Sequence, residues 1–234
     1  MKKLITCFML LTVFAISAQQ SYWTSYSFIV EPENEDTVVK LIDDYFKEHK
    51  IDGVSVSLYA NHFYDDDNTT THMVVFSGSL DAVGAMYAAD NGDAWALLGA
   101  RLDHFIKDSS GARMGTTKIA YGDTDGTYPI QQYYILDVED AKTMQEELTK
   151  FNNKYKPEGR VVMMGNFTSG ISPEGENHWV IAGYKDMKSA LGGNSVGLSD
   201  KEKAARDADW KTFQDNNGGV KMIRSGLRIR VGQW

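Results

Sequence analysis

The arginines near the end of the chain are the residues best suited to bind an anion. Arg224, Arg228 and Arg230 share one parity in a segment whose other parity is mostly apolar, the alternation of a strand with one charged face. A guanidinium group can hold a carboxylate or a phosphate through two parallel hydrogen bonds. We therefore predict that Arg224 and Arg228 contact an acidic ligand. The alternative is an exposed edge strand that is protected from aggregation by its charges.

Two histidines occupy equivalent places at the start of two predicted strands. His72 precedes the apolar run Met-Val-Val, and His178 precedes the run Trp-Val-Ile. Imidazole groups can exchange protons near neutral pH or bind haem iron. We include both histidines among the candidate ligand-binding residues and leave haem open as a cofactor, although none is predicted. The alternative is that both are strand-end residues without a role in chemistry.

A third candidate group combines aromatic and amide side chains. Tyr59 and Asn61 lie toward the end of a predicted strand, and strand ends with their loops often carry binding groups. Asn166 and Phe167 end a later predicted strand in the same way. Together with Trp179 these residues could form an aromatic pocket for a small molecule. The alternative for these residues is ordinary packing in the core.

Common catalytic and metal-binding motifs are absent. The acidic turn at 65–68 lacks the glycine and the distant glutamate of an EF-hand loop, so no metal site is predicted. The sequence contains no Gly-x-Ser-x-Gly, no His-Glu-x-x-His, no P-loop and no dinucleotide fingerprint. These absences disfavour the corresponding hydrolases and the nucleotide- or NAD-dependent enzymes. No catalytic residue is assigned, and whether the protein is an enzyme stays open.

The chain repeats itself at a spacing of about 106 residues, which is a sign of duplicated structural units. Strand-like segments surround Phe28 and Tyr134, and a helical stripe of Val38, Ile42 and Tyr45 recurs as Met144, Leu148 and Phe151. His72 and His178 follow the same offset. The alternative is two unrelated halves with a similar order of elements.

Each half is predicted to contain the order strand, helix, strand, strand, helical region, strand. The predicted strands are 22–30, 53–62, 71–77 and 112–121, then 131–137, 160–167, 178–184 and 220–231. The predicted helices are 33–50, 80–89 and 93–108, then 139–155, 185–192 and 199–215. The domain boundaries that follow are 1–18 for a signal peptide, 19–125 for the first repeat and 126–234 for the second.

This order, βαββαβ in tandem, resembles the ferredoxin-like fold of the dimeric α/β-barrel superfamily. The resemblance implies an α+β protein in which two tandem ferredoxin-like repeats pack as a pseudo-dimeric α/β barrel. Several strands are apolar on both faces, such as 73–76 and 160–164, as expected where one face meets helices and the other meets a second sheet. The superfamily includes cofactor-free monooxygenases and haem enzymes. No family motif is matched, so no catalytic residue is transferred.

The first residues predict export. Lys2 and Lys3 precede an apolar run of signal-peptide length, and cleavage after Ala18 would also remove Cys7, the only cysteine. We expect a periplasmic or secreted protein with no membrane contact after cleavage. The formal net charge of −8 disfavours nucleic-acid partners.

From these features we predict a small-molecule-binding protein with its site between the repeats, suited to an acidic or aromatic ligand. One alternative is a cofactor-free or haem-dependent oxidoreductase of the barrel type. Another is a non-catalytic structural or interaction protein with a filled core. The chain could be a monomeric pseudo-dimer or form a homo-oligomer.

Overall fold

The structure is a computed structural model that describes residues 21–65, 68–90 and 92–234. The predicted signal peptide, residues 1–18, lies outside the described residues and remains a prediction. Over the part of the chain that is described, we find no helix with the length and apolar character needed to span a bilayer.

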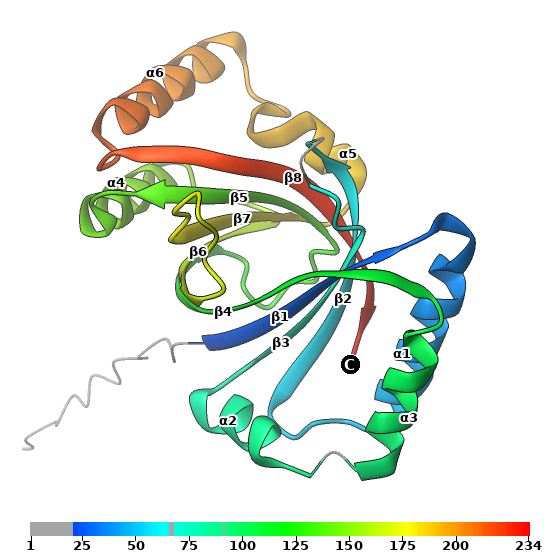
Figure 1. The fold of residues 1–234 in the computed structure, drawn as a ribbon. Helices are drawn as coiled ribbons and strands as arrows, with labels where there is room; N and C mark the ends of the chain where they lie inside the picture. Colours follow the sequence, from blue (N-terminus) through cyan, green and yellow to red (C-terminus); the bar gives the residue numbers. More distant parts are fainter. Residues whose placement is uncertain (1–20, 66–67, 91) are drawn as a thin grey trace, which may run out of the picture.

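The described segments form eight strands and six α-helices in two successive groups (Figure 1). The first group is β1 (Ser21–Val30), α1 (Glu35–Glu48), β2 (Val54–Tyr64), β3 (His72–Gly78), α2 (Leu80–Ala88), α3 (Gly92–Leu102) and β4 (Ile106–Gly122). The second group is β5 (Ile130–Val138), α4 (Ala141–Lys154), β6 (Arg160–Ser169), β7 (His178–Tyr184), α5 (Met187–Gly192), α6 (Asp200–Asn216) and β8 (Val220–Gln233). Short 3₁₀ turns cover Pro32–Asn34 and Gly193–Ser195.

The strands close into one barrel in the order β1-β3-β2-β8-β5-β7-β6-β4, and every neighbouring pair is antiparallel. This confirms the predicted α+β class and the closed barrel. The first half contributes β4-β1-β3-β2 and the second contributes β8-β5-β7-β6, so both halves arrange their strands in the same order. The halves meet at two seams, β2 with β8 and β4 with β6.

The helices lie outside the barrel and bury one face of each half-sheet. Val38, Ile42 and Phe46 of α1 pack against outward side chains of β1, β2 and β3 in one core. Met144 and Leu148 of α4 occupy the corresponding place in the second half. The i, i+4 spacing of these residues in the sequence explains why both segments form amphipathic helices on a sheet.

The start of β4 and the environment of β8 differ from the sequence expectations. The helix predicted to reach 108 ends at Leu102, and β4 begins at Ile106 rather than at 112. This polar segment is a strand because it pairs with β1, an interaction that local sequence patterns do not encode. Strand β8 pairs with β2 on one side and β5 on the other, so the alternative of an exposed edge strand is wrong.

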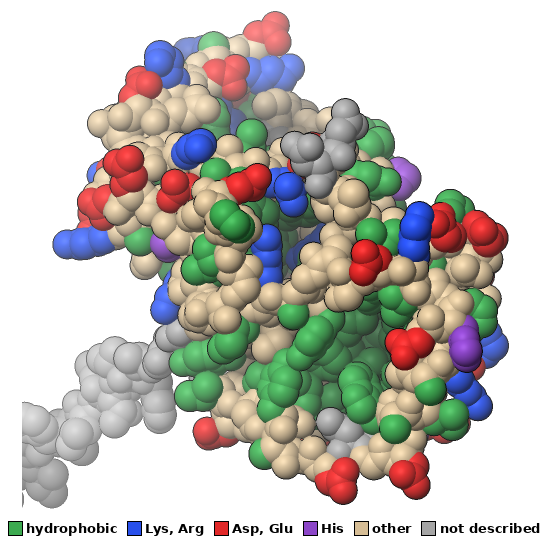
Figure 2. All heavy atoms as spheres, viewed as in Figure 1, with side chains coloured by type: hydrophobic (Ala, Val, Ile, Leu, Met, Phe, Trp, Pro, Cys, Tyr) green, Lys and Arg blue, Asp and Glu red, His purple; other side chains and the backbone are tan. Residues whose placement is uncertain are grey.

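The outer face of the first half is only partly covered. Figure 2 shows a wide apolar hollow in the lower part of the molecule, where α1, α2 and α3 surround the outside of the sheet in Figure 1. Tyr26 of β1 and Tyr87 of α2 are 43% and 53% exposed, and their hydroxyl oxygens are 2.6 Å apart. The barrel interior, described below, is a separate space on the other face of the same strands.

The C-terminal residue anchors β8 on the first half. Trp234 and Val56 exchange two backbone hydrogen bonds of 2.9 Å, and the indole stacks on Phe46 with the ring centroids 5.5 Å apart. The indole Nε1 also donates to Asp43 at 3.1 Å. Figure 1 shows the C-terminus beside α1. Trp234 therefore fastens the β2–β8 seam to the outer core.

We expect Trp234→Ala to lower the free energy of unfolding by about 2 kcal/mol, less than for a fully buried aromatic residue because the indole is half-buried. Urea unfolding followed by circular dichroism measures the change. The control is Gln233→Ala, an exposed neighbour whose replacement should change stability by less than about 0.5 kcal/mol. Equal effects of the two substitutions would show that the seam does not depend on the indole.

Candidate functional site

The barrel encloses a cavity of 370 Å³ between the two half-sheets. Eight-stranded barrels have an interior wide enough to be filled by side chains or to hold one small ligand, and a site of this size suits the second role. In Figure 2 a hollow near the centre of the face shows basic side chains at its rim and inside it. The lining combines three arginines, five aromatic residues, and serine, threonine and amide side chains. Among the described lining residues there is no aspartate or glutamate.

One wall of the cavity is aromatic. Trp23 of β1 packs edge-to-face against Phe167 and Trp179, with ring centroids 5.8 and 5.9 Å apart. Each indole lies over a glycine on the neighbouring strand, Trp23 over Gly115 and Trp179 over Gly165. A Cβ at either glycine would lie 2.6 or 2.5 Å from an indole carbon, so these positions have no room for a side chain. The glycines therefore leave room for the two indoles against the neighbouring strands.

Arg228 of β8 lies deep in the cavity and is 8% exposed. Its Nε and Nη2 donate to Gln131 Oε1 at 3.0 and 2.8 Å, and Gln131 Nε2 donates to the Tyr59 hydroxyl at 3.1 Å. Its guanidinium carbon also lies 4.2 Å from the centre of the Tyr59 ring, a cation–π distance. Burial lowers the pKa of Arg228, and the two nearby tyrosines, Tyr59 and Tyr133, oppose that shift.

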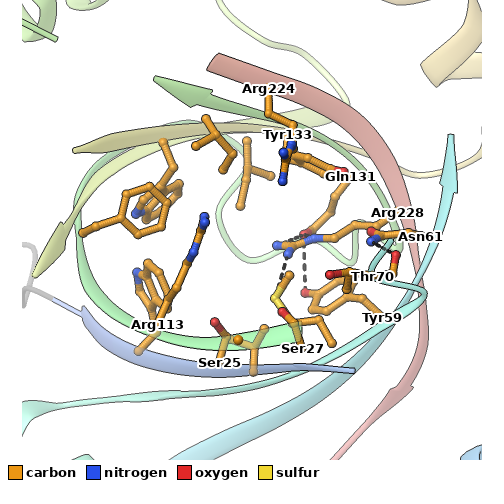
Figure 3. Close-up of a pocket in the computed structure, with 18 of the residues that line it drawn as sticks. Ser25, Ser27, Tyr59, Asn61, Thr70, Arg113, Gln131, Tyr133, Arg224 and Arg228 are labelled. Carbon is orange, nitrogen blue, oxygen red and sulfur yellow. Dashed lines mark hydrogen bonds between the residues drawn. The ribbon is translucent and has the colours of Figure 1, made fainter. Parts of the chain in front are cut away.

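Arg113 of β4 approaches the cavity from the opposite side (Figure 3). Its Nη2 donates to Glu176 Oε1 at 2.6 Å, and its guanidinium carbon lies 5.2 Å from the Phe167 ring centre. Glu176 is almost fully buried and also accepts hydrogen bonds from the Ser172 hydroxyl and backbone N–H. Burial raises the pKa of Glu176, but the Ser172 hydrogen bonds and the charge of Arg113 outweigh it, so the pKa lies below its usual value.

Arg224 of β8 is the third basic group and pairs with Asp65, with Nε 3.4 Å from Oδ2. Arg224 thus forms an ion pair with the β2–β3 loop. Arg113 forms a similar ion pair with Glu176 of the β6–β7 loop. In both pairs the arginine comes from one half of the chain and the loop from the other. Asn68, also in the β2–β3 loop, is buried and donates to the Tyr133 hydroxyl at 3.1 Å. The loops thereby contribute to the basic and polar part of the cavity.

The structure brings most of the predicted site residues together. Five of the seven line the cavity: Tyr59, Asn61, Trp179, Arg224 and Arg228. Figure 3 shows that the guanidinium groups of Arg113, Arg224 and Arg228 point into the cavity from three sides. Arg230 shares the parity of Arg228 and pairs with Tyr59 of β2, but it is not among the residues that line the cavity. The prediction that the five residues bind a ligand stays a prediction.

His72 and His178, the other two candidate ligand-binding residues, do not line the cavity. Met73 and Val75 of β3 point inward, so the alternation of the strand turns His72 toward the helices. There it is buried, stacks on Phe28 with the ring centroids 5.9 Å apart, and its Nδ1 lies 3.0 Å from Thr71 Oγ1. Burial lowers the pKa of both histidines, which favours neutral rings.

The positions of the histidines bear on whether the cavity could hold haem, because haem iron needs a protein ligand. All five histidines of the chain lie in the described part, and none lines the cavity. The hydroxyls of Tyr59 and Tyr133, which could replace histidine as iron ligands, accept hydrogen bonds from Gln131 and Asn68. The cavity therefore does not fit haem well, and no chemical step is derived through it. Over the described residues there is also no group of three or more metal-ligating side chains.

Sequence reasoning missed several cavity residues: Trp23, Arg113, Gln131 and Tyr133. Trp23 is on the same parity of β1 as Ser25 and Ser27, which also face the cavity. This alternation of serines with apolar residues was a usable signal for an inward polar face. Arg113 had no such signal, because its role depends on a loop carboxylate 63 positions away.

Comparisons with known proteins identify the fold. No known sequence family matches the chain, and no curated protein matches it. Among solved structures, a proposed monooxygenase from Fusobacterium nucleatum subsp. nucleatum is similar, with 16% identity and a TM-score of 0.59 over 91% of this chain and 93% of that chain. An anthrone oxidase-like protein is 10% identical, with a TM-score of 0.55 over 92% of this chain and 93% of that chain.

A chlorite dismutase variant from Candidatus Nitrospira defluvii, in complex with cyanide, is also similar. It is 12% identical, with a TM-score of 0.52 over 91% of both chains. Identities this low support a shared fold and nothing more specific. The similarity to these structures thus supports the expected fold, an α+β protein whose strands close into one barrel.

We expect Glu176→Gln to lower the free energy of unfolding at pH 7 by about 3 kcal/mol, because it leaves Arg113 half-buried beside a neutral group. The lowered pKa of Glu176 means that its contribution is present above the unfolded value of about 4.5 and is lost as the pH falls through the folded value. The stabilities of the wild type and the variant should therefore converge in acid. Urea unfolding between about pH 7 and pH 3 measures this difference.

The matched control is Glu174→Gln, an exposed acid in the same loop whose replacement should change little. A constant difference between wild type and Glu176→Gln across this pH range would contradict the assignment of a charged, stabilising Glu176.

Proposed function

We propose that the barrel interior binds an anionic aromatic small molecule and, as an oxidoreductase that needs no bound cofactor, oxidises it there. The observation that carries the proposal is the cavity itself, which has three arginines and an aromatic wall but no described carboxylate among its lining residues. Guanidinium groups that line a cavity favour an anion, and the aromatic rings favour a flat apolar body.

The binding part of the proposal agrees with the predicted small-molecule site between the two halves. A structural or interaction protein was expected to have a filled core, whereas this barrel contains 370 Å³ of space. The space is bordered by side chains from both halves, such as Trp23 and Ser25 from β1 and Gln131 and Ile135 from β5. Ligand binding therefore explains the interior better than a purely structural role does.

The oxidative part of the proposal is supported by the structural neighbours, which include a proposed monooxygenase and an anthrone oxidase-like protein. An electron-rich enolate or phenolate can pass electrons directly to O₂. When a ring CH₂ becomes a carbonyl, one oxygen atom of O₂ enters the product and the other leaves as water with the two hydrogens. Arg228 would stabilise the ligand anion and lower the pKa of its acidic group, so that the proton leaves to water.

Two further features belong to the proposal. We infer that the two halves are tandem ferredoxin-like repeats, which the shared strand order and the recurrence of core residues support. We also infer export to the periplasm or the exterior, which rests on the signal-like sequence of residues 1–18.

Oxygen uptake with anthrone as the probe tests the proposed reaction. We expect purified protein without added metal or cofactor to accelerate O₂ consumption, with one O₂ used for each anthrone converted to anthraquinone. Arg228→Met should reduce the rate by at least about 10-fold, because the anion loses its charged partner. Arg230→Met is the matched control, since Arg230 lies on the same strand but outside the cavity lining.

Failure of the wild-type protein to accelerate uptake would reject the oxidation of this probe. Calorimetric titration with the same probe then decides whether the binding part survives. Addition of haemin is a second control: a rate that appears only with haemin would reject the cofactor-free reaction.

A further inference from the structure

The three cavity arginines differ in how their charge is balanced. Arg113 faces the buried carboxylate of Glu176 at 2.6 Å, and Arg224 faces Asp65 at 3.4 Å. Arg228 has no carboxylate partner among the described residues, although it is the most buried of the three. Of the described charges, only that of Arg228 is left uncompensated inside the barrel.

The described hydrogen-bond partners of Arg228 are all neutral. Gln131 Oε1 accepts from both Nε and Nη2, and the only other acceptor among the described residues is the Met73 sulfur, 3.5 Å from Nη1. A thioether is a weak acceptor, and a guanidinium group has five N–H donors. Two of the five N–H donors therefore bind Gln131, and one binds only the weak Met73 acceptor. The remaining two donors have no partner among the described residues.

Such an arrangement is unfavourable for the protein on its own. A buried guanidinium loses its hydration, and neutral amides and aromatic faces replace only part of that interaction. The polar groups around it do not relieve the deficit, since the Asn61 side-chain amide donates to the Thr70 carbonyl and carries no charge. Groups that reduce stability in this way are typical of functional sites.

We propose that the ligand carries a single anionic group, a carboxylate or an enolate- or phenolate-type oxygen, which binds the free N–H groups of Arg228. The planar part of the ligand then extends toward Trp23, Trp179 and Phe167. Figure 3 shows open space between Arg228 and the opposite side of the cavity, where Arg113 lies. This inference rests on the proposed function of the cavity as a ligand site and specifies the class of ligand.

A second anionic group is disfavoured on the far side. Arg113, which would have to bind it, already holds Glu176, and Ser172 holds the same carboxylate with two hydrogen bonds. A dianion would have to displace this buried carboxylate or leave its own second charge beside Phe167 and the tryptophans. Either change weakens binding relative to a monoanion.

Calorimetric titration with three probes of similar shape tests the inference. The probes are 2-naphthoate, the neutral 2-naphthamide and naphthalene-2,6-dicarboxylate. With wild-type protein we expect 2-naphthoate to bind with one-to-one stoichiometry and at least about 10-fold more tightly than either of the others. In Arg228→Met this preference over the amide should disappear, whereas Arg230→Met should keep it.

Thermal unfolding without ligand provides a second readout. We expect Arg228→Met to have the same or a higher melting temperature than wild type, because methionine removes an uncompensated buried charge at similar length. A large loss of stability would show that Arg228 serves the fold, and would overturn the inference even if naphthoate binding is lost.

The outcomes separate this inference from the proposed function. If all three probes bind equally, the cavity is a ligand site but the requirement for one anionic group is wrong. If the dicarboxylate binds most tightly, the ligand is a dianion that spans Arg228 and Arg113. If no probe binds and anthrone does not bind either, the proposed function itself fails.

Discussion

Closure of the barrel depends on the two seams at which strands of opposite halves share backbone hydrogen bonds. At one seam β2 pairs with β8, and at the other β4 pairs with β6. Closure leaves no free sheet edge, so every strand is constrained on both sides. The same closure creates the interior in which the cavity lies. The arginines, the aromatic wall and the space between them all depend on these seams.

Several aromatic residues inside the barrel lie against a glycine on the neighbouring strand. Besides the two tryptophans, Tyr133 lies over Gly226, where an added Cβ would be 2.3 Å from the tyrosine hydroxyl. Aromatic rings that lie along the wall occupy little of the central volume. The glycines are thus as important for the cavity as the residues that line it.

The sequence predicted the order of elements because this order depends on periodic apolar residues, and the resemblance of that order to a known fold implied the closed barrel. The stripe of Val38 and Ile42 recurs as Met144 and Leu148. As expected, both pairs are buried on the sides of α1 and α4 that face the sheet. The parity of β8 correctly placed Arg224 and Arg228 on one face, and closure of the barrel turned that face inward. For His72 the position was predicted but the side of the strand was not, because a strand that is apolar on both faces does not reveal which face is the interior. The Arg113–Glu176 pair joins a strand of one half to a loop of the other, so no local pattern encodes it.

The electrostatic contrast between the surface and the cavity links the fold to the proposed chemistry. The chain carries a formal net charge of −8, yet the described residues that line its cavity have only positive ionisable charges. Charges at the surface are screened by salt over roughly 8 to 10 Å, whereas charges inside a closed barrel are screened much less. An anion therefore gains little from the surface and is favoured only once it reaches the interior. Glu176 and Asp65 hold two of the cavity arginines at the loops. The proposal therefore assigns discrimination between ligands mainly to Arg228, which among the described cavity arginines has no carboxylate partner.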